Sequence, residues 1–349
     1  MDSIFEKASA WQENKLPFVI YSKPNSNKLQ GIFQKSDSLY SIKDFTESGF
    51  AFVSFTGNEK ILIPKHDSII ISETLVNHNF IAKKDIELTF NNDVKNSFEQ
   101  LVTKAIEQIN QNKLDKVVLS RKETFKLDNF QFEIILKKLI KFYPNTFKYC
   151  FYHPKIGFWL GATPEQLLQV QDNILQTVAL AGTQLSNTNN TYTWETKEQD
   201  EQKIVTDYIF DNLQNFSSNL SATIPYTINA GSIAHLKTDI SAVLNDNCDF
   251  GALLKKMHPT PAVCGLPKIK SKNFILENEN YDRKFYAGYL GELNLKTTKN
   301  VDLFVNLRCM SFDEGLTNIY VGCGITKNSN PEKEFFETLN KSKTIKMVL

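Results

Sequence analysis

The stretch VDLFVNLRCMSFDEGLTNIYVGCGIT, residues 301–326, contains two runs of strand-forming residues separated by a short turn. Valine, leucine, isoleucine, phenylalanine and tyrosine dominate both runs, as expected of β-strands. Residues 313–315, Asp-Glu-Gly, supply the residue types that a hairpin turn needs. The stretch therefore predicts two strands, 301–312 and 317–326, that follow each other directly with no helix between them.

Most of the chain repeats this succession of strands. Strand-like runs fill the first 90 residues, a further strand is predicted at 223–236, and Asp172 and Asn173 predict a hairpin turn between two others. Apolar spacing predicts helices at 92–112, 130–143, 196–215, 249–259 and 331–343. Because strands follow strands more often than they alternate with helices, we expect an α+β fold. It should contain large, mostly antiparallel sheets packed in layers with flanking helices, in a single domain over residues 1–349.

Charge and cysteine content limit the classes of protein. The 349 residues carry 40 Lys and Arg against 39 Asp and Glu, a net charge of +1, which favours no nucleic-acid partner. The five cysteines lack CxxC spacing and indicate free thiols in a reducing compartment. The start of the chain lacks a signal-peptide pattern, and no apolar run reaches the roughly 20 residues of a membrane span. We therefore expect a soluble cytoplasmic protein.

Two of the predicted helices carry a pair of carboxylates at i, i+3. Glu198 and Glu201 lie in the third helix, and Glu334 and Glu337 lie in the terminal helix, followed by Lys341. Such residues are common on solvated helix surfaces, where acidic groups suit the helix dipole and Glu–Lys pairs form at i, i+4. Two facing helices could instead hold Mg²⁺, which takes carboxylate, water and substrate oxygens. The pattern alone leaves both interpretations open.

Glu165 and Lys116 are the candidate acid and base. Glu165 follows Thr-Pro in GATPEQLL, residues 161–168. It is either a solvated residue at a bend or helix start, or a carboxyl whose pKa is raised by apolar surroundings. Lys116 opens the strand-like run KVVLS. It is either a lysine that reaches solvent from a strand end, or a desolvated base.

Glycines and one arginine mark further positions. AGT, residues 181–183, ends a predicted strand, and Gly322 lies inside another. Glycine within a strand often marks the close approach of a ligand or of another backbone segment. Arg308 is predicted in mid-strand, on the same face as Asn306 and Met310. An arginine in such an apolar run is rarely buried without an anionic partner.

Nine short motifs together resemble the chorismate-utilising enzymes, which include isochorismate, salicylate, anthranilate and aminodeoxychorismate synthases. In chain order the motifs are KVVLSR, GATPEQLL, LAGT, KEQDEQ, HPTPAVCG, DRKFYAGYLG, LRC, GCGI and EKEFFETLNK. The resemblance implies an anthranilate synthase component I-like fold with its catalytic core at 95–349, whereas residues 1–90 match loosely. It also implies chorismate as substrate and Mg²⁺ as cofactor. We expect a monomer.

The resemblance also implies a role for each matching residue. Metal ligands would be Glu201 and Glu337, supported by Glu198 and Glu334. Substrate contacts would come from Gly182, Thr183, His235, Arg308, Gly322 and Lys341. Lys116 would be the base that activates water, and Glu165 the acid that protonates the leaving hydroxyl. The carboxylates and lysine of the terminal helix would then form a buried charged stripe.

Two residues and one short motif discriminate within the family. Anthranilate synthase-like members carry Gln where Lys116 stands, and aminodeoxychorismate synthases typically carry a lysine where Ala181 stands. PTPA, residues 259–262, resembles the isochorismate synthases, whereas salicylate synthases usually have a Val-Thr pair there. Gln202 and Cys264 depart from the common His and Ser. The resemblance thus favours an isochorismate synthase. A salicylate synthase and a non-catalytic dicarboxylate-binding module remain open, as does the use of the product for menaquinone or a siderophore.

Overall fold

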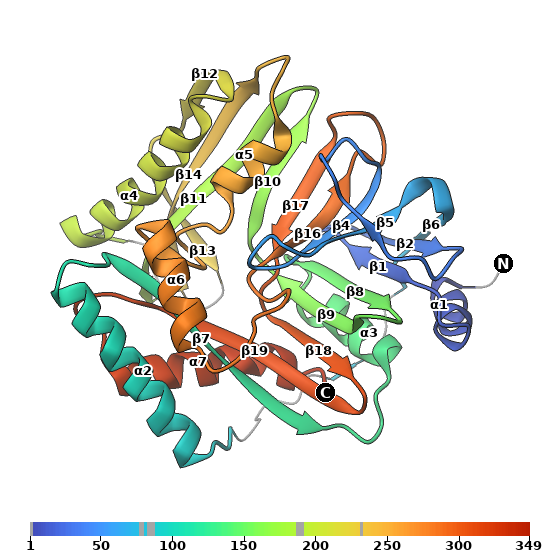
Figure 1. Cartoon of the computed structure of the whole chain (residues 1–349), viewed down its shortest axis with the longest axis horizontal. Coiled ribbons are helices and arrows are strands. Elements are labelled where there is room, and N and C mark those ends of the chain that lie inside the picture. The colour runs from blue at the N-terminus through green and yellow to red at the C-terminus, as the bar shows by residue number, and fades with distance from the viewer. Residues whose placement is uncertain (1–2, 77–79, 82–87, 186–191, 231–232) are drawn as a thin grey trace.

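The computed structural model describes residues 3–76, 80–81, 88–185, 192–230 and 233–349. Within these residues the chain forms two large sheets, here named sheet A and sheet B (Figure 1). Every recorded strand pairing is antiparallel. The α+β fold with antiparallel sheets is confirmed.

The strands of both sheets come from widely separated parts of the chain. Sheet A contains, in spatial order, β15 (Gly265–Leu266), β7 (Lys116–Lys126), β19 (Leu316–Ile325), β18 (Cys309–Asp313), β9 (Gly157–Thr163), β8 (Phe147–His153), β1 (Phe18–Ser22), β2 (Lys28–Gln34) and β6 (Ser68–Thr74). Sheet B contains β12 (Ser217–Ala222), β14 (Ile233–Leu244), β11 (Ile174–Leu185), β10 (Gln166–Gln171), β17 (Val301–Val305), β16 (Tyr289–Leu293), β4 (Gly49–Val53), β5 (Lys60–Pro64) and β3 (Tyr40–Ser41), with β13 (Tyr226–Ala230) paired to β14. Both sheets include strands from the first 75 residues.

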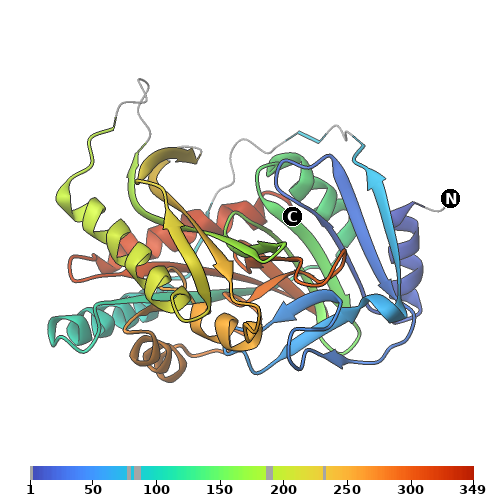
Figure 2. The ribbon, with the colours of Figure 1, turned by 90° about the horizontal axis from the view of Figure 1, so that it is seen from above.

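Helices flank the sheets (Figures 1 and 2). They are α1 (Ile4–Glu13), α2 (Asn92–Asn110), α3 (Phe132–Phe142), α4 (Thr196–Leu213), α5 (Phe250–Met257), α6 (Lys268–Asn278) and α7 (Pro331–Lys346). α4 packs on β11 and β14, α7 on β19 and α2, and α3 on β8 and β9. None of the described helices has both the length and the apolar character that crossing a membrane requires.

Sheet A separates two hydrophobic cores. Alternate residues of β1 enter different cores, with Val19 and Tyr21 in the core shared with sheet B, and Phe18 and Ile20 in the core beneath α1 and α3. Strands buried on both faces read as nearly continuous apolar runs, which explains the sequence FVIY. The shared core extends to Leu339 of α7, so packing ties the terminal helix to the sheets.

The local turn signals are confirmed, while two helices were not predicted. Asp172 and Asn173 both have positive φ, at 51° and 66°, between the paired strands β10 and β11. α1 lies in a region predicted as strands and turns, although Ser3 and Glu6 form a capping box at its start. α6 follows Pro267 and was also missed. The strand predicted at 223–236 is instead the adjacent pair β13 and β14.

The opening stretch contains a break that strand patterning did not reveal. Residues predicted as one strand belong to β17 in sheet B and β18 in sheet A, and Arg308 between them has a φ of 48°. The predicted face shared by Arg308, Asn306 and Met310 is therefore wrong. Asn306 holds the crossing, because its Nδ2 donates to the Phe285 carbonyl at 2.9 Å and its Oδ1 accepts from the Tyr149 hydroxyl at 2.6 Å.

Candidate active site

Two neighbouring crossings between the sheets carry Arg308 and Glu165. The chain passes from β9 in sheet A to β10 in sheet B through Pro164 and Glu165, so a helix does not begin there. The Val305 amide donates to the Glu165 carbonyl at 2.9 Å, and the Ala162 amide donates to the Arg308 carbonyl at 3.1 Å. These hydrogen bonds place the two crossings side by side, although the bonded residues are 140 and 146 positions apart.

Glu165 has the electrostatic character of an acid. Its side chain is half-buried. Burial raises the pKa of this carboxyl, and the positive charges of Lys116, Arg308 and Lys341 partly oppose the rise. Lys116, Arg308 and Lys341 are therefore the predicted site residues that lie close enough to Glu165 to affect its pKa.

Lys116 lies at the first position of β7, and its pKa is shifted in the opposite direction, downwards. Burial lowers the pKa of its amine, the carboxylates of Glu201, Glu165 and Glu337 oppose that change, and Lys341 adds to it. A Cβ built on Gly324 of the neighbouring strand would lie 3.1 Å from the Lys116 Cε and 3.7 Å from its Nζ. The glycine therefore leaves room for the lysine side chain across β19.

Gly182 joins sheet B to the first acidic helix. It has a φ of 73° at a bulge in β11, and a Cβ there would lie 3.1 Å from the carbonyl oxygen and 3.2 Å from the Cβ of Glu198 in α4. Nδ1 of His235 lies 3.2 Å from the Gly182 carbonyl oxygen, and burial lowers the His235 pKa. Thr183 pairs with His235 in the ladder, but its side chain lies outside the described residues. A left-handed bulge thus brings β11, β14 and α4 into contact.

The charged stripe of α7, Glu334, Glu337 and Lys341, is only partly buried. Lys341 Nζ donates to the Gly322 carbonyl at 2.9 Å and pairs with Glu337 Oε1 at 2.6 Å. Burial raises the pKa of Glu334, which also contacts Ser329 and Cys323. The Glu337 side chain is 49% exposed, so the expectation of a fully buried stripe is wrong. A carboxylate that receives a ligand must remain accessible.

The carboxylates of Glu201 and Glu337 could hold Mg²⁺ only if water or substrate oxygens complete its coordination. No group of three or more His, Cys, Asp or Glu side chains in the described ranges is arranged to hold a metal ion. Glu201 and Glu337, from two different helices, both act electrostatically on Lys116. Mg²⁺ commonly binds through one or two carboxylates and keeps water or substrate oxygens in its remaining positions. These two carboxylates fit that mode of binding.

Tyr286 belongs to the same group of residues and was not singled out from the sequence. A Cβ on Gly322 would lie 2.8 Å from the Tyr286 hydroxyl and 2.7 Å from the Leu119 carbonyl oxygen, which confirms the expected close approach at this glycine. Burial lowers the pKa of the Arg308 guanidinium, and the neighbouring Tyr286 opposes that change. The motif DRKFYAGYLG contains this tyrosine, but its position became evident only from the packing of the loop before β16 against β19.

Comparison with known proteins finds similar sequences and similar solved structures. Residues 63–349 match the family model described as chorismate binding enzyme. Isochorismate synthase MenF of Escherichia coli (strain K12) is 30% identical over 268 residues, which are 73% of this chain and 60% of that protein. The chain therefore spans less than two thirds of the length of this relative.

Solved structures share the fold. MenF, the menaquinone-specific isochorismate synthase from Escherichia coli, superposes with a TM-score of 0.80 at 20% identity, covering 100% of this chain and 91% of that chain. Anthranilate synthase component I from Streptococcus pneumoniae TIGR4 gives a TM-score of 0.72 at 18% identity, with coverages of 94% and 92%. Since the family model covers most of the sequence, the chain belongs to the chorismate-binding enzyme family.

Proposed function

We propose that this protein is an isochorismate synthase that converts chorismate to isochorismate with the aid of Mg²⁺. Water adds at C2 of the ring and the C4 hydroxyl leaves. The observation that carries the proposal is the opposed pair of shifts, because the pKa of Lys116 is lowered while that of Glu165 is raised. Such a pair suits a base and an acid that act in the same reaction.

The two residues balance the protons of the reaction. Lys116 takes a proton from water as the water oxygen bonds to C2. The ring double bonds shift, the C4–O bond breaks, and the leaving hydroxyl takes the proton of Glu165. Both side chains are partly accessible, so each can return to its starting protonation state by exchange with solvent.

Charge complementarity supports a substrate with two carboxylates. Arg308 and Lys341 both act on the charge of Glu165 and supply the cations that carboxylates need. His235 and the Gly182 bulge would contact the ring beside α4. When bound by Glu201 and Glu337, with Glu198 and Glu334 supporting them, Mg²⁺ would neutralise a carboxylate of the ring. We also infer a cytoplasmic monomer formed by one domain.

Product analysis distinguishes this proposal from its alternatives. Purified protein incubated with chorismate and Mg²⁺ in oxygen-18 water should form isochorismate that carries one labelled oxygen. Salicylate and pyruvate as products would support the salicylate synthase alternative. Incorporation of ammonium, or binding of chorismate without turnover, would contradict the proposal. Isochorismate is an intermediate in the biosynthesis of menaquinone and of siderophores. The neighbouring genes would indicate which of the two pathways uses the product.

A plot of the rate against pH is expected to have a rising limb and a falling limb. The rate rises with pH as Lys116 loses its proton, and it falls as Glu165 loses its own, since the base must be neutral and the acid protonated. Glu165→Gln should lower kcat/KM by about 10²-fold or more and remove the falling limb. Measurement of kcat/KM against pH checks this, with Glu133→Gln on α3 as the control. A falling limb that persists in Glu165→Gln would assign it to another group.

Gly324→Ala is expected to displace the Lys116 amine. The added methyl would lie 3.1 Å from the Lys116 Cε, so the side chain must shift by a few tenths of an ångström. Small displacements of a catalytic group can be costly, and we expect kcat to fall about 10-fold with little change in KM. Gly251→Ala in α5 is the control, because its added Cβ meets atoms no closer than 3.4 Å. Equal kcat values for the two variants would contradict this expectation.

A further inference from the structure

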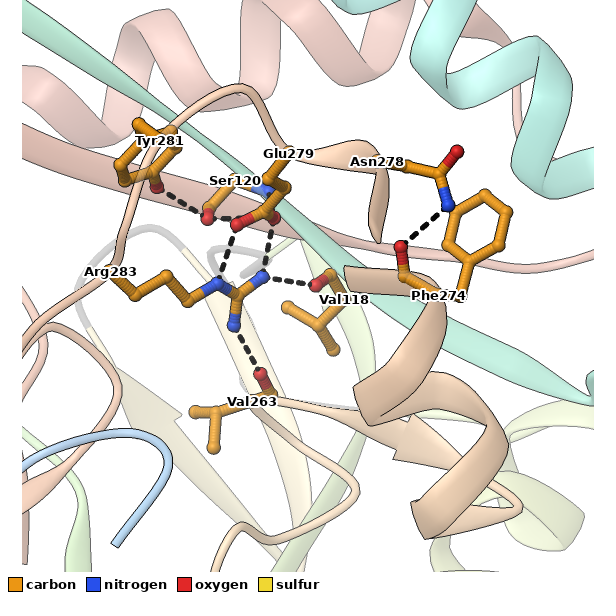
Figure 3. A network of polar contacts seen from close by, with 8 residues as sticks. All are labelled: Val118, Ser120, Val263, Phe274, Asn278, Glu279, Tyr281 and Arg283. Atoms are coloured by element: carbon orange, nitrogen blue, oxygen red, sulfur yellow. Dashed lines mark hydrogen bonds and ion pairs between the residues drawn. The ribbon is translucent and has the colours of Figure 1, made fainter. Parts of the chain in front are cut away.

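The outer edge of β7 is completed by side chains where its neighbouring strand ends. β15 pairs with β7 only at Lys116 and Val117, and the Val118 amide then donates to the Cys264 carbonyl at 2.8 Å. Farther along the same edge, Arg283 Nη2 donates to the Val118 carbonyl at 2.7 Å. The Ser120 amide donates to Glu279 Oε1 at 2.7 Å. A donor and an acceptor side chain thus take the places of a strand's amide and carbonyl groups (Figure 3).

The Arg283 guanidinium holds both chains of this short ladder. Nη1 donates to the Val263 carbonyl at 3.0 Å, two residues before β15 begins, while Nη2 reaches β7. Nε and Nη2 also pair with the two oxygens of Glu279, at 2.7 and 2.6 Å. The Arg283 residue is only 2% exposed and Glu279 only 8%, and the guanidinium stacks over the Phe55 ring at 4.5 Å. All three guanidinium nitrogens are therefore used, as Figure 3 shows.

Lys116 lies at the other end of the same ladder. Its register partner is Leu266, and the Ser271 hydroxyl donates to its carbonyl at 3.0 Å. Only the two paired positions of β15 and the bond from Val118 to Cys264 separate it from the residues that Arg283 holds. The pairing of β7 with β19 begins only at Val117, so the backbone of Lys116 is held by β15, by the bond from the Asp115 amide to the Leu266 carbonyl at 2.9 Å and by Ser271. Because this edge has so few bonds, we expect the side-chain bonds at its far end to contribute to the position of Lys116.

Stability alone gives a weak reason for this ion pair. A buried ion pair often stabilises a protein no more than apolar side chains of similar volume, because both charges lose their hydration. A planar guanidinium, however, can satisfy two carbonyls and a carboxylate at fixed angles, which an apolar group cannot. Its geometry therefore points to a role in positioning.

We propose that Glu279 and Arg283 are positioning residues that act as a substitute strand and hold Lys116 in place for the reaction. The inference rests on the proposed function, in which Lys116 is the base. Neither residue takes part in the proton transfers. Their effect passes through the backbone of residues 116–120 and through the segment 263–266.

Arg283→Lys tests the proposal, because it keeps the positive charge beside Glu279 but cannot reproduce the planar contacts to both carbonyls. We expect kcat to fall at least 10-fold while KM for chorismate stays within about 2-fold. Tyr281→Phe is the matched control. It removes the hydroxyl that lies 2.6 Å from Ser120 Oγ in the same network but leaves the bonds along the β7 edge, so kcat should stay within about 2-fold of the unsubstituted protein.

A second readout does not depend on turnover. The rate at which acetic anhydride modifies the Lys116 amine, measured against pH by peptide mass spectrometry, should change in Arg283→Lys and not in Tyr281→Phe. This change would persist even if the unsubstituted protein formed no isochorismate, which separates failure of the proposed function from failure of this inference. If Arg283→Lys does not fold, the neutral double variant E279Q/R283Q undergoes the same comparison. Unchanged kcat and labelling in the folded variant, or equal losses in Tyr281→Phe, would overturn the inference.

Discussion

Replacing Lys116 with methionine is expected to lower isochorismate formation by about 10³-fold while the folded protein becomes more stable. The loss follows from removal of the base that accepts the proton of water, a contribution of about 10²–10⁴-fold in enzymes. Methionine is chosen because its unbranched side chain fits the space beside Gly324 without a charge.

The gain in stability has a definite dependence on pH. Burial lowers the pKa of the Lys116 amine, so the folded state binds this proton less tightly than the unfolded chain does. The free-energy cost of burying the protonated Lys116 amine is fully present below the pKa of this amine in the folded state. It disappears as pH rises past the pKa of the amine in the unfolded chain, about 10.4. Lys116→Met should therefore raise the midpoint of thermal unfolding most at neutral and lower pH, and least at strongly alkaline pH.

Thermal unfolding and product formation measured on the same preparation check both parts. Lys113→Met, at an exposed position just before β7, is the control and should change neither quantity appreciably. A Lys116→Met variant that retains activity would remove Lys116 from the reaction. One that loses both activity and stability would indicate a mainly structural role for the lysine.

The second large effect concerns the two acidic helices. Glu201→Gln and Glu337→Gln are each expected to lower activity by about 10³-fold, because several kcal/mol of charge stabilisation depends on the bound ion. Chelation of Mg²⁺ with EDTA should lower the activity of the unsubstituted protein to a similar extent, and added Mg²⁺ should restore it.

Comparison of single and double variants tests whether the two carboxylates serve one ion. Groups that share a ligand are not additive, so the double variant should be hardly worse than either single variant. Titration calorimetry with MgCl₂, in the presence of chorismate, gives a direct readout of binding. Glu332→Gln is the control in α7, since Glu332 is exposed and pairs with Lys95 at 2.7 Å. A shared site would be contradicted if the activity loss of the double variant equalled the product of the two single losses. It would also be contradicted if the Glu201 and Glu337 variants bound Mg²⁺ as the unsubstituted protein does.

Sequence patterns predicted those turns and helices that are determined by residues close together in the chain. Asp172 and Asn173 tolerate positive φ, so their hairpin could be predicted from neighbouring residues. The helices that carry Glu198 with Glu201 and Glu334 with Glu337 follow from apolar spacing within each segment. α1 had a local signal too, in the capping box of Ser3 and Glu6, and missing it was a failure of interpretation.

The break at Arg308 had no comparable signal. The run from 301 to 312 reads as one strand, because a strand buried on both faces is apolar whichever sheet it belongs to. Asn306 lies at the change of sheet, where its Nδ2 donates to the Phe285 carbonyl and its Oδ1 accepts from the Tyr149 hydroxyl, 21 and 157 positions away in sequence. Partners so distant cannot be identified from a short window of sequence.

The amino-acid sequence by itself determined the class of fold, most helices, the hairpin turns and the set of ordered motifs from which each candidate residue was named. Only the tertiary structure decided that Lys116, Glu165, Arg308 and the carboxylates of α4 and α7 act on one another. Periodicity and turn chemistry arise from contacts within a few residues, whereas the shifted pKa values and the crossings between sheets arise from burial among different strands and helices that lie far outside any local window of sequence. Those contacts exist only once both sheets have packed together.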